Sequence, residues 1–431
     1  MSDQTTEATL ATRAEADTPL EPTVAGKTRM GRLLTGVLPA TVGMYALYQG
    51  IQQVLIPLQV QEIDPKQKVA NLAIITAISA VTSLIALPIG GAVSDRTRGR
   101  FGRRSPWLLA SGITSAILVV IMGLMNFLWP LAIVYAAVWF AANFYQGVWA
   151  AILPDRVPIA RRGLASSVIG MGTPLGILLG VNYVAQVSRE VAYISLGAFL
   201  VAATMFLVFF APEGPYTEPR PVKEKHSVIR RVGEFFSGFS HVNFRYAFAS
   251  RFLLYLAYFV INGYLLYTLQ DRVGVQNVPG QSAAVGIGIL VTINTLAWIG
   301  SAALSGWLAD VFKRRKMFVG IAAVGMGLAS LIPVFFPTWT AMVVFAFFVG
   351  FFKGSYLAVD FALMSLVLPN RDSEGRDMGL LSVATGAPQL ISGAIAGLLI
   401  TFAGGYVSLF IFGTVVAFLA GLAVIPIRNI R

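Results

Sequence analysis

Polar side chains that can hydrogen-bond a hydroxylated molecule stand inside several long apolar stretches of this sequence. In the first stretch Tyr45, Gln49 and Gln52 follow one another at helical spacing, flanked by Tyr48 and Gln53. Residues at i, i+4 and i+7 lie on one face of a helix, and amides and hydroxyls both donate and accept hydrogen bonds. Five polar side chains in nine residues exceed what helix packing needs. We interpret this stripe as the lining of a binding cavity, with interhelical hydrogen bonding as the alternative.

Later apolar stretches carry similar groups. They are Trp139, Asn143 and Gln146 in the fourth stretch and Tyr255, Tyr258 and Asn262 in the seventh. We assign these to the same cavity. Asn294 and Trp298 in the eighth stretch, and Gln389 in the eleventh, are lone polar groups that suit packing equally well.

Three charged residues fall within apolar stretches: Arg251, Lys353 and Asp360. A charge in hydrocarbon costs at least about 2.5 kcal/mol on insertion scales, so each is a functional candidate. Lys353 and Asp360 are seven residues apart on one helix face, with Tyr356 between them, and their α-carbons are roughly 10 Å apart. We predict that this face lines the cavity; the alternative is a charge pair that braces the tenth helix against a neighbour. Arg251 is expected to extend to the membrane interface.

The composition indicates an integral membrane protein. Hydrophobic residues make up 56% of the 431 residues and charged residues only 12%, against about 25% in soluble domains. Cysteine is absent and the two histidines lie in one polar segment, so we expect no metal site and no cofactor. The sequence has no nucleophile–base arrangement or nucleotide loop in a suitable context, which argues against an enzyme. The net charge of +12 is spread over short loops, which argues against nucleic-acid binding.

Twelve apolar runs, each near the ~20 residues that span a bilayer, predict an all-α membrane protein. Their approximate limits are 34–58, 69–92, 106–127, 130–151, 164–186, 191–211, 246–270, 283–309, 317–336, 339–364, 378–403 and 405–427. With the N-terminus inside, 26 of the 32 Lys and Arg residues fall in cytoplasmic segments and four in external loops. The positive-inside rule therefore predicts that both termini are cytoplasmic. The excess of Arg over Lys, 24 to 8, favours a bacterial source and hence a bacterial plasma membrane.

The basic segment 91–106, GAVSDRTRGRFGRRSP, has a shorter copy at 306–316, GWLADVFKRRK. The two begin 215 residues apart, half the chain length, and Leu-Pro-Asp-Arg at 153–156 recurs as Leu-Pro-Asn-Arg at 368–371. The chain therefore consists of two copies of one unit. We predict a disordered cytoplasmic tail (1–32), a first six-helix bundle (33–211), a cytoplasmic linker (212–245) and a second six-helix bundle (246–431).

The segment 91–106 resembles the loop signature between the second and third helices of the major facilitator superfamily, most closely in its glycoside–pentoside–hexuronide symporter branch and related sugar carriers. The resemblance covers roughly residues 33–427. It implies two pseudo-symmetric six-helix bundles with substrate between them. Cation-coupled members of the melibiose-permease type carry acidic ligands on the second helix; residues 69–92 have none, which makes Na⁺ a less suitable coupling ion than H⁺. Asp360 is then the mid-helix carboxylate left for coupling.

The resemblance also implies a gate at the basic segments. In the family the carboxylate of Asp95 meets the start of the eleventh helix, here near 378–381, with Arg96 and Arg104 adding hydrogen bonds across the halves. By the repeat, Asp310 and Arg314 are expected to act in the same way near 163–165. The alternative is that the arginines only fix topology.

The sequence thus predicts a secondary transporter for a small polar solute, working as a monomer in the lipid bilayer. The resemblance implies that this solute is a sugar or glycoside. A proton-linked exporter of a drug or metabolite is the alternative, because the glycine-rich segment 170–176 loosely resembles a motif of such antiporters. Close helix packing also explains those glycines. An alternative of another class is a non-transporting membrane receptor or scaffold.

Overall fold

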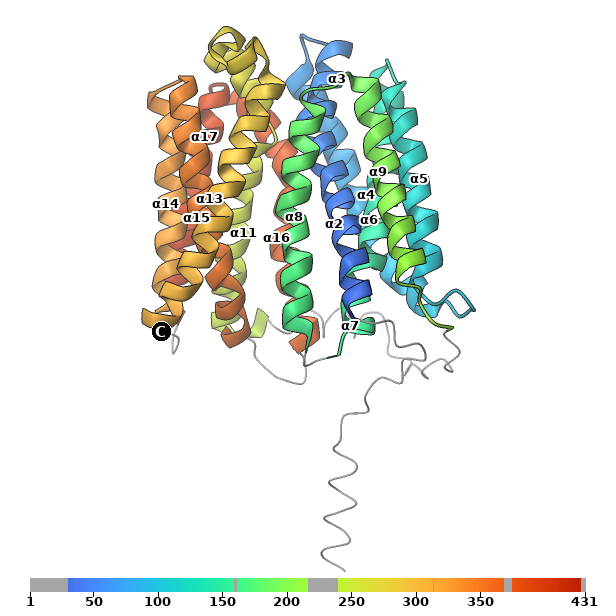
Figure 1. Cartoon of the computed structure of the whole chain (residues 1–431). Coiled ribbons are helices and arrows are strands. Elements are labelled where there is room, and N and C mark those ends of the chain that lie inside the picture. Colours follow the sequence, from blue (N-terminus) through green and yellow to red (C-terminus); the bar gives the residue numbers. More distant parts are fainter. Residues whose placement is uncertain (1–29, 159–160, 216–238, 313, 368–373, 428–431) are drawn as a thin grey trace, which may run out of the picture.

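The structure is a computed structural model that describes residues 30–158, 161–215, 239–312, 314–367 and 374–427. Long helices run side by side along one direction, and the loops gather at the two ends (Figure 1). The predicted tail, up to residue 29, lies outside the described residues. Most of the predicted linker does so as well.

The helices of the first half follow one another with short connections. They are α2 (Met30–Gly50), the π-helix η1 (Ile51–Leu55), α3 (Ile56–Ile63), α4 (Lys68–Arg96), α5 (Ser105–Gly123), α6 (Leu128–Ala150), α7 (Ile152–Arg156), α8 (Arg162–Val184) and α9 (Arg189–Phe210). The second half contains α11 (Val242–Asn262), α12 (Leu265–Thr268), the π-helix η4 (Leu269–Gly274), the 3₁₀ turns η5 (Val275–Asn277) and η6 (Pro279–Gln281), α13 (Ala283–Phe312), α14 (Arg315–Phe335), α15 (Trp339–Val367), α16 (Glu374–Phe402) and α17 (Tyr406–Val424).

In the described part of the chain, eleven helices are long and apolar enough to cross a membrane. The remaining predicted span is the continuous helical segment α2–η1–α3, which is less apolar because it carries the tyrosine and glutamine stripe. The predicted fold, two six-helix bundles of an all-α membrane protein, is confirmed. The seventh predicted span, 246–270, is interrupted: α11 ends at Asn262, two residues form a turn, and the chain continues as α12 and η4. Gly263 at this break has low helix propensity.

Glycines bring helices of the same half into close contact. On α8, a Cβ at Gly176 would lie 2.6 Å from the carbonyl oxygen of Val42, and one at Gly180 would clash with the backbone at Ala46. Both contacts are with α2. Close packing against α2 thus accounts for Gly176 and Gly180, whereas a Cβ at Gly170 would meet nothing within 4 Å, and the exporter alternative stays open.

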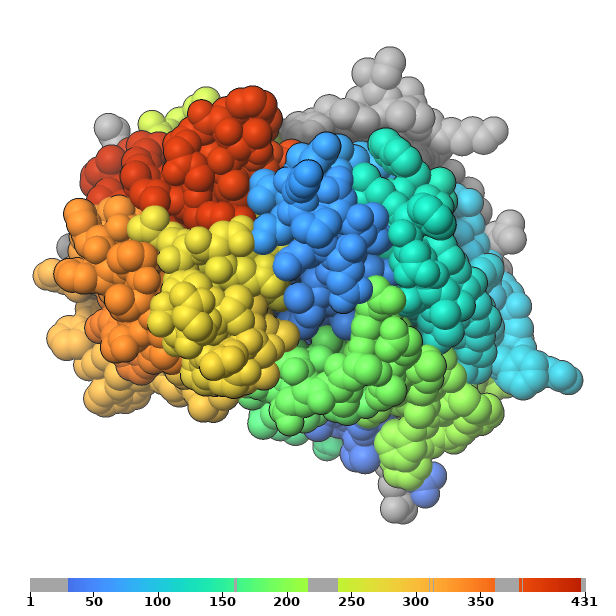
Figure 2. Space-filling view, turned by 90° about the horizontal axis from the view of Figure 1, so that it is seen from above, coloured from blue at the N-terminus to red at the C-terminus, as the bar shows by residue number. Residues whose placement is uncertain are grey.

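The two halves touch along α4 with α16 and along α8 with α13. Glycines mark the first contact, because a Cβ at Gly393 would meet Thr76 and one at Gly397 would meet Ala73. These residues lie toward one end of the molecule, which we call the Lys68 end; the opposite end, which carries residues 91–106, is the Arg-rich end. Seen from the Lys68 end, atoms of the second half (yellow and red) press directly against those of α3 and α4 (blue) (Figure 2).

Candidate functional site

Tyr48, Trp139 and Gln146 form a polar and aromatic group between α2 and α6. The Tyr48 ring stacks on Trp139 with centroids 4.9 Å apart, and its hydroxyl donates to Oε1 of Gln146 at 3.4 Å. A small cavity beside them is lined by Leu47, Tyr48, Ile51, Val138, Trp139 and Ala142. The structure thus joins predicted residues from two helices into one wall.

The glutamines lie in and beside η1, where the chain widens from an α-helix to a π-helix. Gln53 Nε2 donates to Gln49 Oε1 at 2.6 Å, and Gln389 Nε2 on α16 donates to Gln52 Oε1 at 3.4 Å. Single π turns inside α-helices occur frequently at functional sites. Here the π turn carries Gln52 at a hydrogen bond that joins the two halves, and this gives the lone Gln389 of the sequence a partner.

Three predicted cavity residues make local contacts. Asn143 is buried, and its amide donates to Ser83 Oγ on α4 at 3.1 Å and to the Trp139 carbonyl oxygen at 2.8 Å. Asn262 donates to the Tyr258 carbonyl oxygen in its own helix at 2.9 Å. The Cβ of Tyr45 faces Gly176 of α8. These contacts favour a packing role for Asn143. That Asn262 and Tyr45 line a binding cavity stays a prediction.

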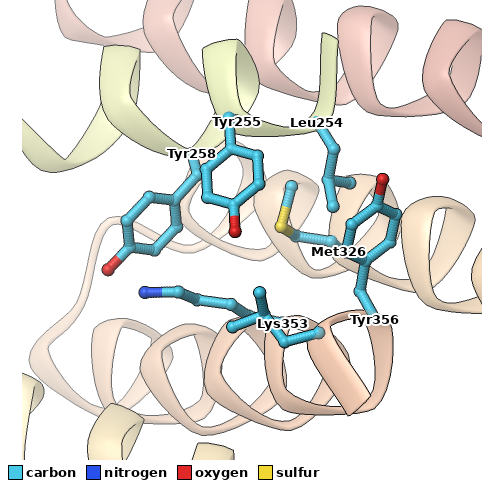
Figure 3. A pocket seen from close by; sticks show the side chains of 7 residues that line it. Leu254, Tyr255, Tyr258, Met326, Lys353 and Tyr356 are labelled. Carbon is cyan, nitrogen blue, oxygen red and sulfur yellow. The ribbon is translucent and has the colours of Figure 1, made fainter. Parts of the chain in front are cut away.

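Lys353 is the charged residue that the second half contributes to the candidate binding site. Its Nζ lies 3.8 Å from the centroid of the Tyr258 ring on α11 and 4.7 Å from the Trp298 ring on α13. The neighbouring cavity is lined by Leu254, Tyr255, Tyr258, Met326, Lys353, Tyr356 and Leu357 (Figure 3). Its cavity volume is only about 10 Å³, far below the size of typical ligand pockets. A bound solute therefore needs space between the two halves as well.

The structure brings Arg251 and Asp360 together, an ion pair that the sequence did not predict. Arg251 does not extend to the interface; it is 5% exposed and its Nη1 lies 3.0 Å from Oδ2 of Asp360, which is fully buried. Arg251 Nε also donates to Thr385 Oγ1 on α16 at 2.9 Å. Asp360 therefore pairs with Arg251 rather than with Lys353. The pair braces α15 against α11, which was the alternative weighed for this face.

At the Arg-rich end, Arg104 is the centre of a charge network. Its side chain is 4% exposed and bonds to Asp95 at 2.6 Å and to Asp155 at 2.7 Å. Sequence reasoning missed Glu213, whose carboxylate accepts from the backbone N–H groups of Arg104 and Ser105 at the start of α5. Gly102 has φ +83° and would clash with Glu213 if it carried a Cβ, so the glycine of the basic segment is required here.

The expected gate contacts are placed as follows. Asp95 and Arg104 bond within the first half, so Arg104 does not bridge the halves in this structure. Arg96 is exposed at the end of α4, and Arg314 is exposed at the start of α14. The side chains of Asp310 and Met378 lie outside the described part of the chain. The gate therefore stays a prediction for a different conformation.

The Lys68 end carries an ion pair that sequence reasoning missed. Lys68 Nζ at the start of α4 lies 2.7 Å from Oδ1 of Asp271 in η4, and the Tyr406 hydroxyl donates to Oδ2 of Asp271 at 2.5 Å. Arg272 anchors η4 to the end of α14, because it donates hydrogen bonds to the carbonyl oxygens of Pro333 and Val334. Burial lowers the pKa of the Arg272 guanidinium. In addition, the Tyr267 hydroxyl donates to the Pro57 carbonyl oxygen at 2.7 Å. The Lys68–Asp271 pair and the Tyr267–Pro57 bond connect the two halves.

Known proteins resemble this chain in sequence and in fold. Monocarboxylate transporter 2 of Meriones unguiculatus is 27% identical over 204 residues, 46% of this chain and 40% of that protein. The lactose permease of Leuconostoc lactis is 26% identical over 334 residues, 69% of this chain and 50% of that protein. The chain thus matches half or less of the length of these relatives.

Among solved structures, the nucleoside transporter NupG superposes with a TM-score of 0.72 at 13% identity, covering 92% of this chain and all of that one. At this identity the likeness shows the fold alone. The sequence profile of the Major Facilitator Superfamily matches residues 40–285 and 247–430, which together span both halves. With two helical bundles, polar groups between them and this match over most of its length, the chain belongs to the Major Facilitator Superfamily of membrane transporters.

Proposed function

We propose that the chain is a secondary transporter that moves a small polar solute of the sugar or glycoside class by alternating access. The observation that carries this proposal is a cluster of glutamine side chains to which both halves contribute. In it, Gln389 donates a hydrogen bond to Gln52, next to the Gln49–Gln53 pair. Amides exchange hydrogen bonds readily with sugar hydroxyls. Lactose, named in one relative, is a solute of this class.

Alternating access requires two states in which opposite ends of the molecule are closed. Several hydrogen bonds between the halves lie between the middle of the helices and the Lys68 end. Besides those above, Asn182 donates to Thr292 Oγ1 at 2.8 Å. This pattern is what a state closed at the Lys68 end needs. If the N-terminus is cytoplasmic, that state faces inward.

Asp360 is our proposed site for a coupled proton. The carboxylate is fully buried and its charge is balanced by Arg251 at 3.0 Å. Protonation removes the counter-charge of Arg251, so the charged and neutral forms favour different arrangements of α11 and α15.

Purified protein in proteoliposomes tests the proposal with labelled monosaccharides and disaccharides under imposed H⁺ or Na⁺ gradients. We expect sugar to accumulate with an inward H⁺ gradient and not with Na⁺ alone. Asp360→Asn should lose accumulation, whereas Glu190→Gln, at an exposed carboxylate, should keep it. Failure of every sugar to enter would reject the solute class. Equal proton-driven accumulation in Asp360→Asn and the parent would reject the coupling site.

A further inference from the structure

We propose that Lys353 is the binding residue for an anionic group of the solute and that this group is a carboxylate. The inference rests on the proposed transport function and narrows its solute to a hydroxylated acid. Three observations carry it: the depth of Lys353, the balance of charge around it, and its unused hydrogen-bond donors.

Lys353 lies at the middle of α15, the helix that runs from Trp339 to Val367. Near midspan it is too far from either end for its side chain to leave the membrane easily. Its ammonium lies against rings of α11 and α13, so it points toward other helices rather than toward lipid. Figure 3 shows the nitrogen beside Tyr258, at the edge of the group rather than enclosed by it.

The mid-membrane charges of the second half do not cancel. Arg251 and Asp360 form one neutral pair. Lys353 makes no ion pair with any described residue, which leaves one positive charge uncompensated at this depth. Desolvated charges are costly unless they are paired, so the charge count favours a negative partner that arrives from outside the chain.

The aromatic rings satisfy Lys353 in part. The faces of two aromatic rings attract the ammonium electrostatically. A ring face, however, does not offer the oxygen acceptor that a carbonyl or a carboxylate provides. An ammonium has three N–H donors, and within the described residues it has no oxygen acceptor. The donors are therefore available to oxygen atoms of a ligand, and a purely structural cation would normally use them.

A carboxylate fits this site better than a phosphate. Phosphate recognition typically uses arginine forks or several cations, and the nearby guanidinium of Arg251 is already committed to Asp360 and Thr385. One ammonium balances one carboxylate. The glutamines of η1 and Gln389 then serve the hydroxyl groups of the same solute.

The charge can be tested without knowing the solute, because the protein has no cysteine of its own. Single cysteines at Leu357 and Asn262 are labelled with anionic sulfonatoethyl methanethiosulfonate or with its cationic trimethylammonioethyl analogue. We expect Lys353→Gln to lower the anionic-to-cationic rate ratio about tenfold, as loss of a nearby unit charge should. Lys353→Arg should keep the ratio. Lys66→Gln, which removes an equal charge from an exposed loop, is the matched control. An unchanged ratio in Lys353→Gln overturns the inference.

Transport of matched pairs identifies the group. Glucuronate is compared with glucose, and glycerate with glycerol, in proteoliposomes containing parent, Lys353→Gln or Lys353→Arg protein. We expect the acids to enter through the parent and the Arg variant at least tenfold faster than through the Gln variant. Entry of the acids at equal rates in all three proteins overturns the carboxylate assignment. Sugar transport still stands in that case if the neutral members enter. Absence of transport for all four solutes counts against the inference. The proposed sugar transport is then tested separately by the uptake of neutral disaccharides.

Discussion

The two ends of the molecule use charge in different ways. At the Lys68 end the ion pair between Lys68 and Asp271 joins the halves. At the Arg-rich end Arg104 bonds to Asp95 and Asp155, all in the first half. A bond between halves changes the balance of conformations, whereas a bond within one half stabilises that half in every conformation. Substitutions at the two ends should therefore be read by different measurements.

Removal of Arg104 should have the largest effect, and it should be on stability. Arg104→Ala removes the buried partner of Asp95 and Asp155, although Arg103 still pairs with Asp155, and we expect unfolding to become easier by about 2 kcal/mol. Thermal unfolding in detergent measures this. Arg100→Ala, at an exposed arginine of the same loop, should change little. Similar losses in both variants would show that general loop charge matters and the network does not.

Breaking the pair at the Lys68 end should shift conformation with little loss of stability. Asp271→Asn removes a partly exposed ion pair worth about 1 kcal/mol, so the state open at this end should gain about fivefold. The reporter is thiol labelling of Thr76→Cys, which lies against Gly393 between the halves. The exchanged pair Lys68→Asp with Asp271→Lys should restore slow labelling. Faster labelling in the exchanged protein than in Asp271→Asn would contradict a role for the pair.

Glu213→Gln should cost about 0.5 kcal/mol of stability at the Arg-rich end. The amide keeps an acceptor for the N–H groups at the start of α5 but loses the negative charge that the helix N-terminus favours. Chemical unfolding compares this variant with Glu190→Gln. Labelling of Thr76→Cys should stay the same, because Glu213 bonds within one half; a change would place Glu213 among the contacts that set conformation.

Asp95→Asn should give the smallest effect, opposite in sign to that of Asp271→Asn. The Asp95 side chain is 57% exposed here, so its pairing with Arg104 adds little to stability. If it meets the start of α16 in the other state, its loss disfavours that state about twofold and slows labelling of Thr76→Cys. Labelling equal to the parent would leave topology as the function of the basic segment.

Much of the fold follows from local patterns in the sequence. Continuous apolar runs determine the spans because backbone groups in lipid must be satisfied within a helix. The repeat of segment 91–106 at 306–316 indicates two related halves without any tertiary information. The stripe in the first span was likewise visible at helical spacing. The partners of its members come from the structure, in which Tyr48 donates to Gln146 and Gln389 donates to Gln52.

Charge partners were decided by tertiary structure alone. Asp360 and Lys353 share a helix face in the sequence, yet Asp360 pairs with Arg251 on another helix, because the rotation of α11 against α15 brings that guanidinium within 3.0 Å. Lys68 and Asp271 are 203 residues apart and meet only because the halves close at one end. Helical periodicity fixes which residues of one helix lie together, and it carries no information about which face of a distant helix they will meet.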